Sequence, residues 1–163
     1  MDPDNSRITD LSSIEPENFK VRNTEFLKDK KHHYDNPRNK TYTEQRAEIW
    51  RVINDDLDRV LEDLPIDRQL HEQCALWVHA VVGKHFFEDA NHRTAIALLR
   101  KLLRDNRIDP GNWPTDRVMQ ARDESHDVRR EIPAVRLDTL YEKDALYCVW
   151  LQFFTDALPD EYL

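Results

Sequence analysis

Two amphipathic segments joined by a short polar stretch constrain the fold of this chain more than any other feature. In each segment the apolar residues recur at steps of three and four, which is typical of a helix that buries one face. The first segment runs from Asp67 to Val82 and the second from Asn91 to about Asp105. Their apolar residues are Leu70, Cys74, Trp77, Val78 and Val81 in the first and Ala95, Leu98, Leu99, Leu102 and Leu103 in the second. The sequence therefore predicts a pair of helices that meet at residues 85–95.

Gly83 follows the last periodic residue of the first segment. A glycine at this place commonly ends a helix in the left-handed conformation. We therefore expect the first helix to stop at Gly83, with Lys84 and His85 in the turn that follows.

A further helix is predicted upstream of this pair. Thr41 and Glu44 have the spacing of a capping box, in which each residue bonds the backbone of the other at a helix start. Apolar residues then recur as far as Leu61, and Pro65 separates this helix from the central pair. We expect one continuous helix between Thr41 and Leu61.

Two more helices are predicted downstream. Thr115 opens a polar helix to about Arg130 that we expect to be peripheral, and Pro133 ends it. Thr139 opens a last helix through Leu158, which is apolar on nearly all sides. Such a helix is either the central helix of the core or a surface through which a homodimer forms.

No convincing pair of strands is present, and 163 residues suffice for one domain with its own core. We therefore predict an all-α fold, a single-domain helical bundle. Residues 1–20 are polar and rich in proline, aspartate and serine, which favours a loosely ordered N-terminal arm with at most one short helix. Residues 21–163 are expected to form the helical domain.

Composition excludes several classes of partner. The chain has 32 acidic residues against 24 Lys and Arg, a net charge of −8, and nucleic-acid binding requires clustered cations instead.

Both cysteines, Cys74 and Cys148, lie in apolar helical stretches and are expected in the core rather than in a disulfide. There is no signal peptide and no apolar run of membrane length, so we expect a cytoplasmic protein that does not bind membranes.

The junction between the two central helices reads HFFEDANHRTA and collects side chains suited to binding a polyphosphate. His85 offers an imidazole, whose ordinary pKa of ~6.5 lets it accept a proton near neutral pH. Asp89 offers a carboxylate for a metal ion, Asn91 a polar anchor and Arg93 a cation. The free amides and the dipole at the start of the second helix also favour an anion there. Phe87 is expected to pack into the core and hold the loop in place.

This stretch resembles the signature of the Fic/Doc family, H-x-F-x-[D/E]-[G/A]-N-x-R, and its continuation Thr94-Ala95 is similar to the Doc branch. The matching residues are His85, Phe87, Asp89, Ala90, Asn91 and Arg93. The resemblance implies a helical bundle of the Fic/Doc type in which His85 is the general base for a hydroxyl of a target protein. It also implies that Asp89 holds Mg²⁺ on the phosphates of ATP, while Asn91 and Arg93 cradle those phosphates.

Four departures from the pattern of AMP-transferring Fic proteins, H-P-F-x-[D/E]-G-N-G-R-x-x-R, bear on the reaction. They are Phe86 in place of proline, Ala90 and His92 in place of glycines, and Ile96 in place of the last arginine. Without the glycines the backbone has less freedom to approach a phosphate. Without the arginine, the protein lacks a positive charge that would orient the nucleotide. Arg100, on roughly the same helical face, is a candidate substitute.

Doc-like members tolerate alanine at the position of Ala90, carry a lysine where His92 stands, and lack the last arginine. The resemblance implies that they bind ATP inverted and transfer its γ-phosphate. We therefore expect phosphoryl transfer to a Ser, Thr or Tyr hydroxyl, with AMP transfer as the alternative. His92 would contribute the charge of that lysine to nucleotide binding only when its ring is protonated.

The segment upstream of the motif helices forms a flap in Fic/Doc proteins that aligns the target peptide by strand addition. Residues 33–43, which contain the turn-prone Asp35-Asn36-Pro37, are the candidate flap and would form a small β-hairpin. The alternative is a solvated charged loop.

Control of the activity has two candidate sources. The string Ser13-Ile14-Glu15-Pro16-Glu17-Asn18 fits the [S/T]-x-x-x-E-[G/N] pattern by which some Fic proteins block their own ATP site with a glutamate, here Glu17. The other source is a separate, antitoxin-like inhibitory protein, which suits the Doc resemblance.

Two functions of other classes remain open. An HD-type metal phosphohydrolase would use His126-Asp127 together with His79 and a later aspartate such as Asp144. A noncatalytic interaction protein would keep the fold while its motif is degraded. Bound transition metal would favour the first, and failure to bind Mg·ATP would favour the second.

Overall fold

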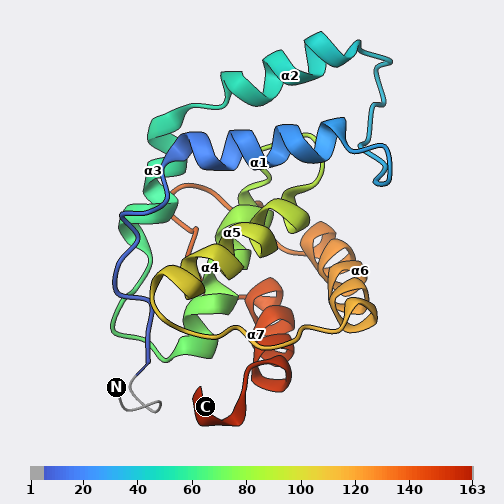
Figure 1. The fold of residues 1–163 in the computed structure, drawn as a ribbon. Helices are drawn as coiled ribbons and strands as arrows, with labels where there is room; N and C mark the ends of the chain where they lie inside the picture. The colour runs from blue at the N-terminus through green and yellow to red at the C-terminus, as the bar shows by residue number, and fades with distance from the viewer. Residues whose placement is uncertain (1–5, 163) are drawn as a thin grey trace.

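The computed structural model describes residues 6–162, and this part of the chain is all-helical, with no strand (Figure 1). The helices are α1 (Pro16–Lys28), α2 (Tyr42–Arg51), α3 (Asn54–Asp63), α4 (Leu70–Lys84), α5 (Asn91–Asp105), α6 (Thr115–Glu131), α7 (Ala145–Ala157) and the short 3-10 helix η2 (Asp160–Tyr162). The prediction of an all-α fold is confirmed. None of these helices is long and apolar enough to cross a membrane.

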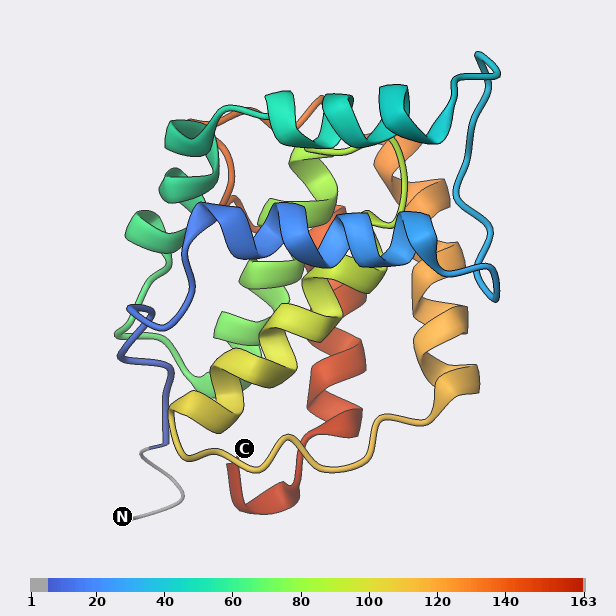
Figure 2. The same ribbon diagram turned by 45° about the horizontal axis from the view of Figure 1, so that its top comes forward.

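Helix α4 lies at the centre of the bundle, and α5 and α7 pack against it. On the outside, α1 crosses α5, α2 runs beside α1, and α6 packs against α7 (Figures 1 and 2). Trp77 joins three of these helices, because its ring stacks on Phe19 of α1 and its indole N–H donates to the carbonyl of Ala95 in α5 at 3.0 Å. The indole proton of a buried tryptophan needs such an acceptor. The centre of the bundle therefore fixes how α4 and α5 sit at the motif.

The expected N-terminal arm is part of the core over the residues that the structure describes. Ile8, Ile14 and Phe19 are buried. The side chain of Gln73 in α4 accepts from the amide of Ile8 at 2.8 Å and donates to the carbonyl of the same residue at 2.9 Å. Buried backbone groups need partners of this kind, and the polar composition that suggested a loose arm does not reveal them. Residues 1–5 lie outside the described part.

The single helix expected between Thr41 and Leu61 is two helices, which corrects the prediction. Its start is as predicted, since Thr41 Oγ1 accepts from the amide of Glu44 at 3.2 Å. The chain then leaves the helical conformation at Val52 and Ile53, between α2 and α3. The break leaves Ile53 60% exposed while Leu57, four residues on, is fully buried. The apolar spacing continues through the break and therefore did not reveal it.

Helix α4 does not end at Gly83, contrary to the prediction. It continues to Lys84, and the left-handed residue at its end is His85, with φ 57°. Gly83 is required for packing instead, because a Cβ at this position would lie 2.7 Å from Cγ2 of Val135. A non-glycine residue with positive φ is uncommon, and histidine is among the types enriched there.

Helix α7 begins at Ala145, later than expected from Thr139, because the carboxylate of Asp144 accepts from the amide of Tyr147 at 3.0 Å and caps the helix. Most of its large apolar side chains are buried within the chain, so α7 is a core helix. Cys74 is buried as predicted, whereas Cys148 is exposed, which corrects the expectation that both cysteines lie in the core.

The predicted β-hairpin at residues 33–43 does not form; this segment is a turn-rich extended stretch. The side chain of Asn36 closes the turn, accepting from the amide of Lys40 at 2.9 Å and donating to its carbonyl at 2.8 Å. Pro37 has no amide proton to offer a partner strand. The side chain of Asn36 therefore binds the backbone groups of Lys40 that a hairpin would pair with a second strand.

Candidate functional site

The loop between α4 and α5 makes a sharp turn that is closed by one side chain. Two of its residues have left-handed backbones: His85 at the end of α4 and Ala90, with φ 60°, just before α5. Asn91 spans the loop, because its Oδ1 accepts from the amide of Phe87 at 3.1 Å and its Nδ2 donates to the carbonyl of Phe87 at 2.8 Å. Phe87 itself is buried, as expected for a residue that holds the loop in the core.

His85 is exposed, and one of its ring nitrogens is held by Asn91. Asn91 Nδ2 lies 3.2 Å from His85 Nδ1, and the bonds to Phe87 fix which end of the amide faces the ring. Since an amide nitrogen only donates, Nδ1 is the acceptor, and the neutral ring carries its proton on Nε2. Desolvation by surrounding protein atoms, followed by the charge of Arg129, lowers the pKa of His85. The ring is therefore neutral at pH 7.

A cavity of about 770 Å³ lies between α5 and α6 and opens beside this loop. All six residues that the sequence singled out for the site border it: His85, Asp89, Asn91, His92, Arg93 and Arg100. The volume is within the usual range of ~300–1,000 Å³ for small-molecule sites. The fold thus brings the whole predicted set to one cavity large enough for a nucleotide.

Arg93 and Asp89 connect this cavity to the segment that was expected to be a flap. Arg93 Nη2 donates to the carbonyl of His33 at 2.8 Å, and its guanidinium lies over the ring of Phe26. Asp89 Oδ2 accepts from the amide of Asp35 at 2.7 Å. Burial lowers the pKa of Arg93, but a guanidinium stays charged at neutral pH. Hydrogen bonds with Asp89 and Arg93 therefore hold residues 33–35 against the motif loop.

His92 borders the cavity without supplying a charge to it. Its ring is buried, and Nε2 lies 2.8 Å from Oγ of Ser125, whose oxygen also accepts from the indole of Trp150. Burial first, and the charge of a protonated His126 next, hold the pKa of His92 well below 6.5. At neutral pH the ring is therefore uncharged, so His92 would take the place of a lysine only in acid.

Arg100 lies further along α5. Its guanidinium stacks on Trp113 at 4.7 Å and Nη2 is 3.4 Å from the carbonyl of Gly111. Seven residues separate it from Arg93, a rise of ~10 Å along a helix. Arg100 thus stands at the opposite end of the cavity from the motif loop.

Three residues of α6 that the sequence reasoning did not place at this site also border the cavity: Arg122, His126, which it named for the HD-type alternative, and Arg129. The helix itself lies on the outside of the bundle, as predicted, with Ala121 and Ser125 as its buried residues, but the prediction did not include its part in the cavity. Their spacing of four and three residues places them on one helical face, and this spacing is the sequence feature that could have indicated them. In a helix that is polar on all sides, such a spacing does not stand out.

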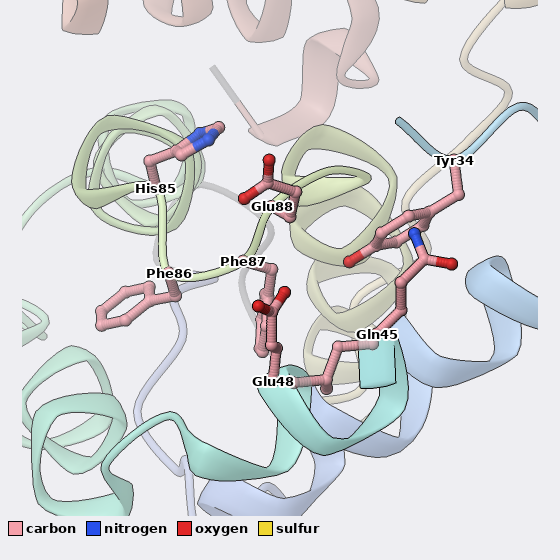
Figure 3. Close-up of a pocket in the computed structure, with 8 residues that line it drawn as sticks. Tyr34, Gln45, Glu48, His85, Phe86, Phe87 and Glu88 are labelled. Carbon is pink, nitrogen blue, oxygen red and sulfur yellow. The ribbon is translucent and has the colours of Figure 1, made fainter. Parts of the chain in front are cut away.

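His85 also borders a second, smaller cavity, of about 270 Å³ (Figure 3). Gln45 and Glu48 reach it from α2, while the motif loop contributes Phe86, Phe87 and Glu88. Tyr34 and Ile49 complete its lining together with His85. Of residues 6–162, only His85 borders both cavities.

Glu17 is not placed to block the cavity. It is exposed at the start of α1, where its carboxylate accepts from Asn54 Nδ2 at 3.0 Å. Phe26, which borders the cavity, is nine residues further along the same helix, a rise of ~13 Å. The structure therefore does not support autoinhibition by Glu17.

The residues of the HD-type alternative are divided between two places in the structure. His79 is buried and its ring nitrogens lie near the carbonyl of Leu140 and the carboxylate of Asp144, whereas the ring of His126 contacts His92. Within residues 6–162 no group of three or more His, Cys, Asp or Glu side chains could hold a metal ion.

No family model, curated protein or solved structure matches the chain. The resemblance to Fic/Doc proteins thus depends on residues 85–95, and their arrangement in space is the evidence on which a function can be argued.

Proposed function

We propose that the chain is a Fic/Doc-like transferase that uses Mg·ATP to phosphorylate a hydroxyl of a target protein. The observation that carries the proposal is the position of His85 between two cavities, only one of which is large enough for a nucleotide. A transferase has to bring a donor and an acceptor to the same proton-accepting group. His85 has this position, with the motif residues on the donor side.

The larger cavity suits the triphosphate. Among the described residues, Arg93 Nη1 is buried without a hydrogen-bond partner, and a phosphate oxygen would satisfy it. Asp89 offers its second carboxylate oxygen for Mg²⁺, since Oδ2 is taken by the amide of Asp35. A single carboxylate fits this ion, because Mg²⁺ with nucleotides commonly uses one or two carboxylates besides phosphates and water.

The apolar part of the cavity favours transfer of the γ-phosphate. Ile96 and Ala97 of α5 and Val118 and Met119 of α6 line it, and Arg100 follows Ile96 by about one helical turn, further along α5 from the motif loop. A base in this apolar part would direct the phosphates toward His85. The terminal phosphate would then lie nearest to the acceptor, as phosphoryl transfer requires.

In the proposed step the acceptor oxygen bonds to the γ-phosphorus while the bond from that phosphorus to the bridging oxygen breaks. ADP leaves with the electron pair, and the hydroxyl proton passes to Nε2 of His85. In the free protein Nε2 already carries the ring proton, because Nδ1 accepts from Asn91. The ring must therefore exchange tautomers first, which places two N–H groups opposite each other and costs more than the ~0.5–1.5 kcal/mol of the one hydrogen bond that is lost.

The acceptor would enter through the smaller cavity, beside residues 33–43. We propose a Ser, Thr or Tyr of a cytoplasmic protein as the acceptor. Since Glu17 is not at the site, we propose that a separate, antitoxin-like protein controls the activity.

The test is incubation of purified protein and cell lysate with ATP labelled with ³²P at either the α or the γ position. The control is His85→Asn, because asparagine tolerates the left-handed backbone at this position. We expect γ label on protein with the wild type and at least a ~10²-fold loss with the variant. Label from α alone would make the protein an AMP-transferase, and no label from either would favour the noncatalytic reading.

Binding is tested separately by calorimetry with ATP. In the presence of magnesium, Asp89→Ala should weaken binding, while without magnesium the difference should shrink. Glu88→Ala is the matched control, because this neighbouring carboxylate does not border the larger cavity. Equal magnesium dependence of the two variants would exclude the proposed role of Asp89.

A further inference from the structure

We propose that α6 forms the second half of an anion clamp, in which Arg122 and Arg129 bind phosphates opposite Arg93. These arginines would supply the charge that the motif lacks at Ile96. The identity of the anion, the phosphate chain of a nucleotide, rests on the proposed function; the existence of the clamp does not.

The charge of the cavity is opposite to that of the chain. The protein has a net charge of −8, yet one carboxylate, that of Asp89, borders the cavity among the residues described. Its cationic lining residues are Lys31, Arg93, Arg100, Arg122 and Arg129. Cations crowded around one cavity repel each other, and a polyanion between them would remove that repulsion.

Two guanidinium nitrogens on opposite sides of the cavity lack partners. Arg93 Nη1 on α5 and Arg122 Nε on α6 are buried and make no hydrogen bond with any described residue. The two side chains are close enough for the charge of Arg122 to contribute to the lowered pKa of Arg93, although burial is the larger cause. Buried donors of this kind are uncommon in folded proteins. An anion with oxygens on two sides would satisfy both.

Arg129 extends the same face of α6 toward the motif loop. It lies seven residues after Arg122, and its Nε is 3.4 Å from the carbonyl of Gly83 near the end of α4. Its charge reaches His85, where it contributes to the lowered pKa. Arg129 is therefore fixed by α4 with its remaining donors available to a phosphate near His85.

The clamp also explains how a motif with Ile96 could retain a nucleotide. Ile96 borders the cavity as an apolar residue of α5, so the wall that would carry the second motif arginine carries no charge at that point. Helix α6 faces that wall across the cavity and presents two arginines. A clamp with cations on both sides favours ligands with several phosphates over those with one.

The test is calorimetric titration with pyrophosphate, with Mg·ATP and with AMP. We expect Arg122→Met and Arg129→Met each to weaken binding of pyrophosphate and ATP at least tenfold, with a smaller change for AMP. The matched control is Arg117→Met, which removes one positive charge from an exposed position of the same helix. Arg122→Lys should restore part of the affinity, because it restores charge without the guanidinium geometry.

Circular dichroism melting would identify any variant that fails to fold, and Arg122→Lys then serves in place of Arg122→Met. Affinities of the α6 variants equal to that of Arg117→Met would overturn the clamp, as would failure of the wild type to bind pyrophosphate. Binding of pyrophosphate that depends on Arg122 in a protein that transfers no label would leave the clamp standing and reject the proposed reaction.

Discussion

The side-chain amide of Asn91 holds the ring of His85, with Nδ2 of the asparagine 3.2 Å from Nδ1 of the histidine. Both other contacts of this amide are to the backbone of Phe87, so it cannot turn over without losing them. The residue that closes the motif loop therefore also selects the tautomer of the proposed base. This couples loop geometry to proton transfer.

The tautomer can be measured without any assay of activity. In ¹⁵N spectra of the wild type above pH 7, we expect Nδ1 of His85 to be unprotonated and Nε2 to carry the hydrogen. Asn91→Asp replaces the donor with an acceptor, so it should transfer the hydrogen to Nδ1. An unchanged pattern in the variant would show that Asn91 does not select the tautomer.

The charge of Arg129 predicts a shift in the titration of His85. Desolvation and Arg129 lower the pKa of His85 below its usual value of 6.5. As a base the ring acts only when unprotonated, so transfer should be constant near neutral pH and fall as pH drops through this lowered pKa. Arg129→Met should raise the midpoint of the NMR titration, whereas Arg117→Met should leave it in place. A midpoint above 6.5 in the wild type would contradict the prediction.

Burial of His92 predicts that the protein loses stability in mild acid. Its pKa is held well below the ordinary 6.5 in the folded state, so the unfolded chain takes up the proton first. The free energy of unfolding should therefore fall as pH drops below ~6.5, by at most about 1.4 kcal/mol per pH unit for this group. Urea denaturation between pH 7.5 and 5.5 measures the slope. In His92→Gln it should be shallower, and equal slopes would assign the acid sensitivity to other groups.

Close packing predicts that Gly83→Ala is destabilising although alanine favours helices. The added Cβ would lie 2.7 Å from Cγ2 of Val135, a clash that costs about 1–3 kcal/mol against a gain of about 1 kcal/mol in helix propensity. Val135→Ala removes the clashing methyl. In that background Gly83→Ala should be much less destabilising, although close contacts to Val135 Cβ at 3.2 Å and Leu146 Cδ2 at 3.3 Å remain. A thermal-melting cycle of the four proteins measures the coupling. Additive effects would show that Gly83 is not required by Val135.

Local pattern alone was enough to predict most helices and the residues of the motif. The bounds of α5 and the cap of Thr41 on α2 agree with the sequence prediction, because apolar periodicity and capping depend on neighbours within a few residues. The motif residues also met at one cavity, since a short loop between two helices keeps its side chains together.

Contacts between distant segments decided the rest. Gly83 lies within α4, where Val135, fifty-two residues later in the sequence, packs against it. The N-terminal segment packs on the bundle where Gln73 of α4 pairs with the backbone of Ile8. Neither contact can be predicted from the local sequence.

The sequence by itself determined that this chain is a helical bundle with a histidine, an acid, an amide and an arginine in one loop. Only the tertiary structure decided that His92 is buried and uncharged and that Arg122 and Arg129 face that loop across a cavity. The physical reason is that α6 is polar on nearly all sides, so its own periodicity does not reveal which side is covered. That side is set by its packing on α7, which turns the arginines toward α5.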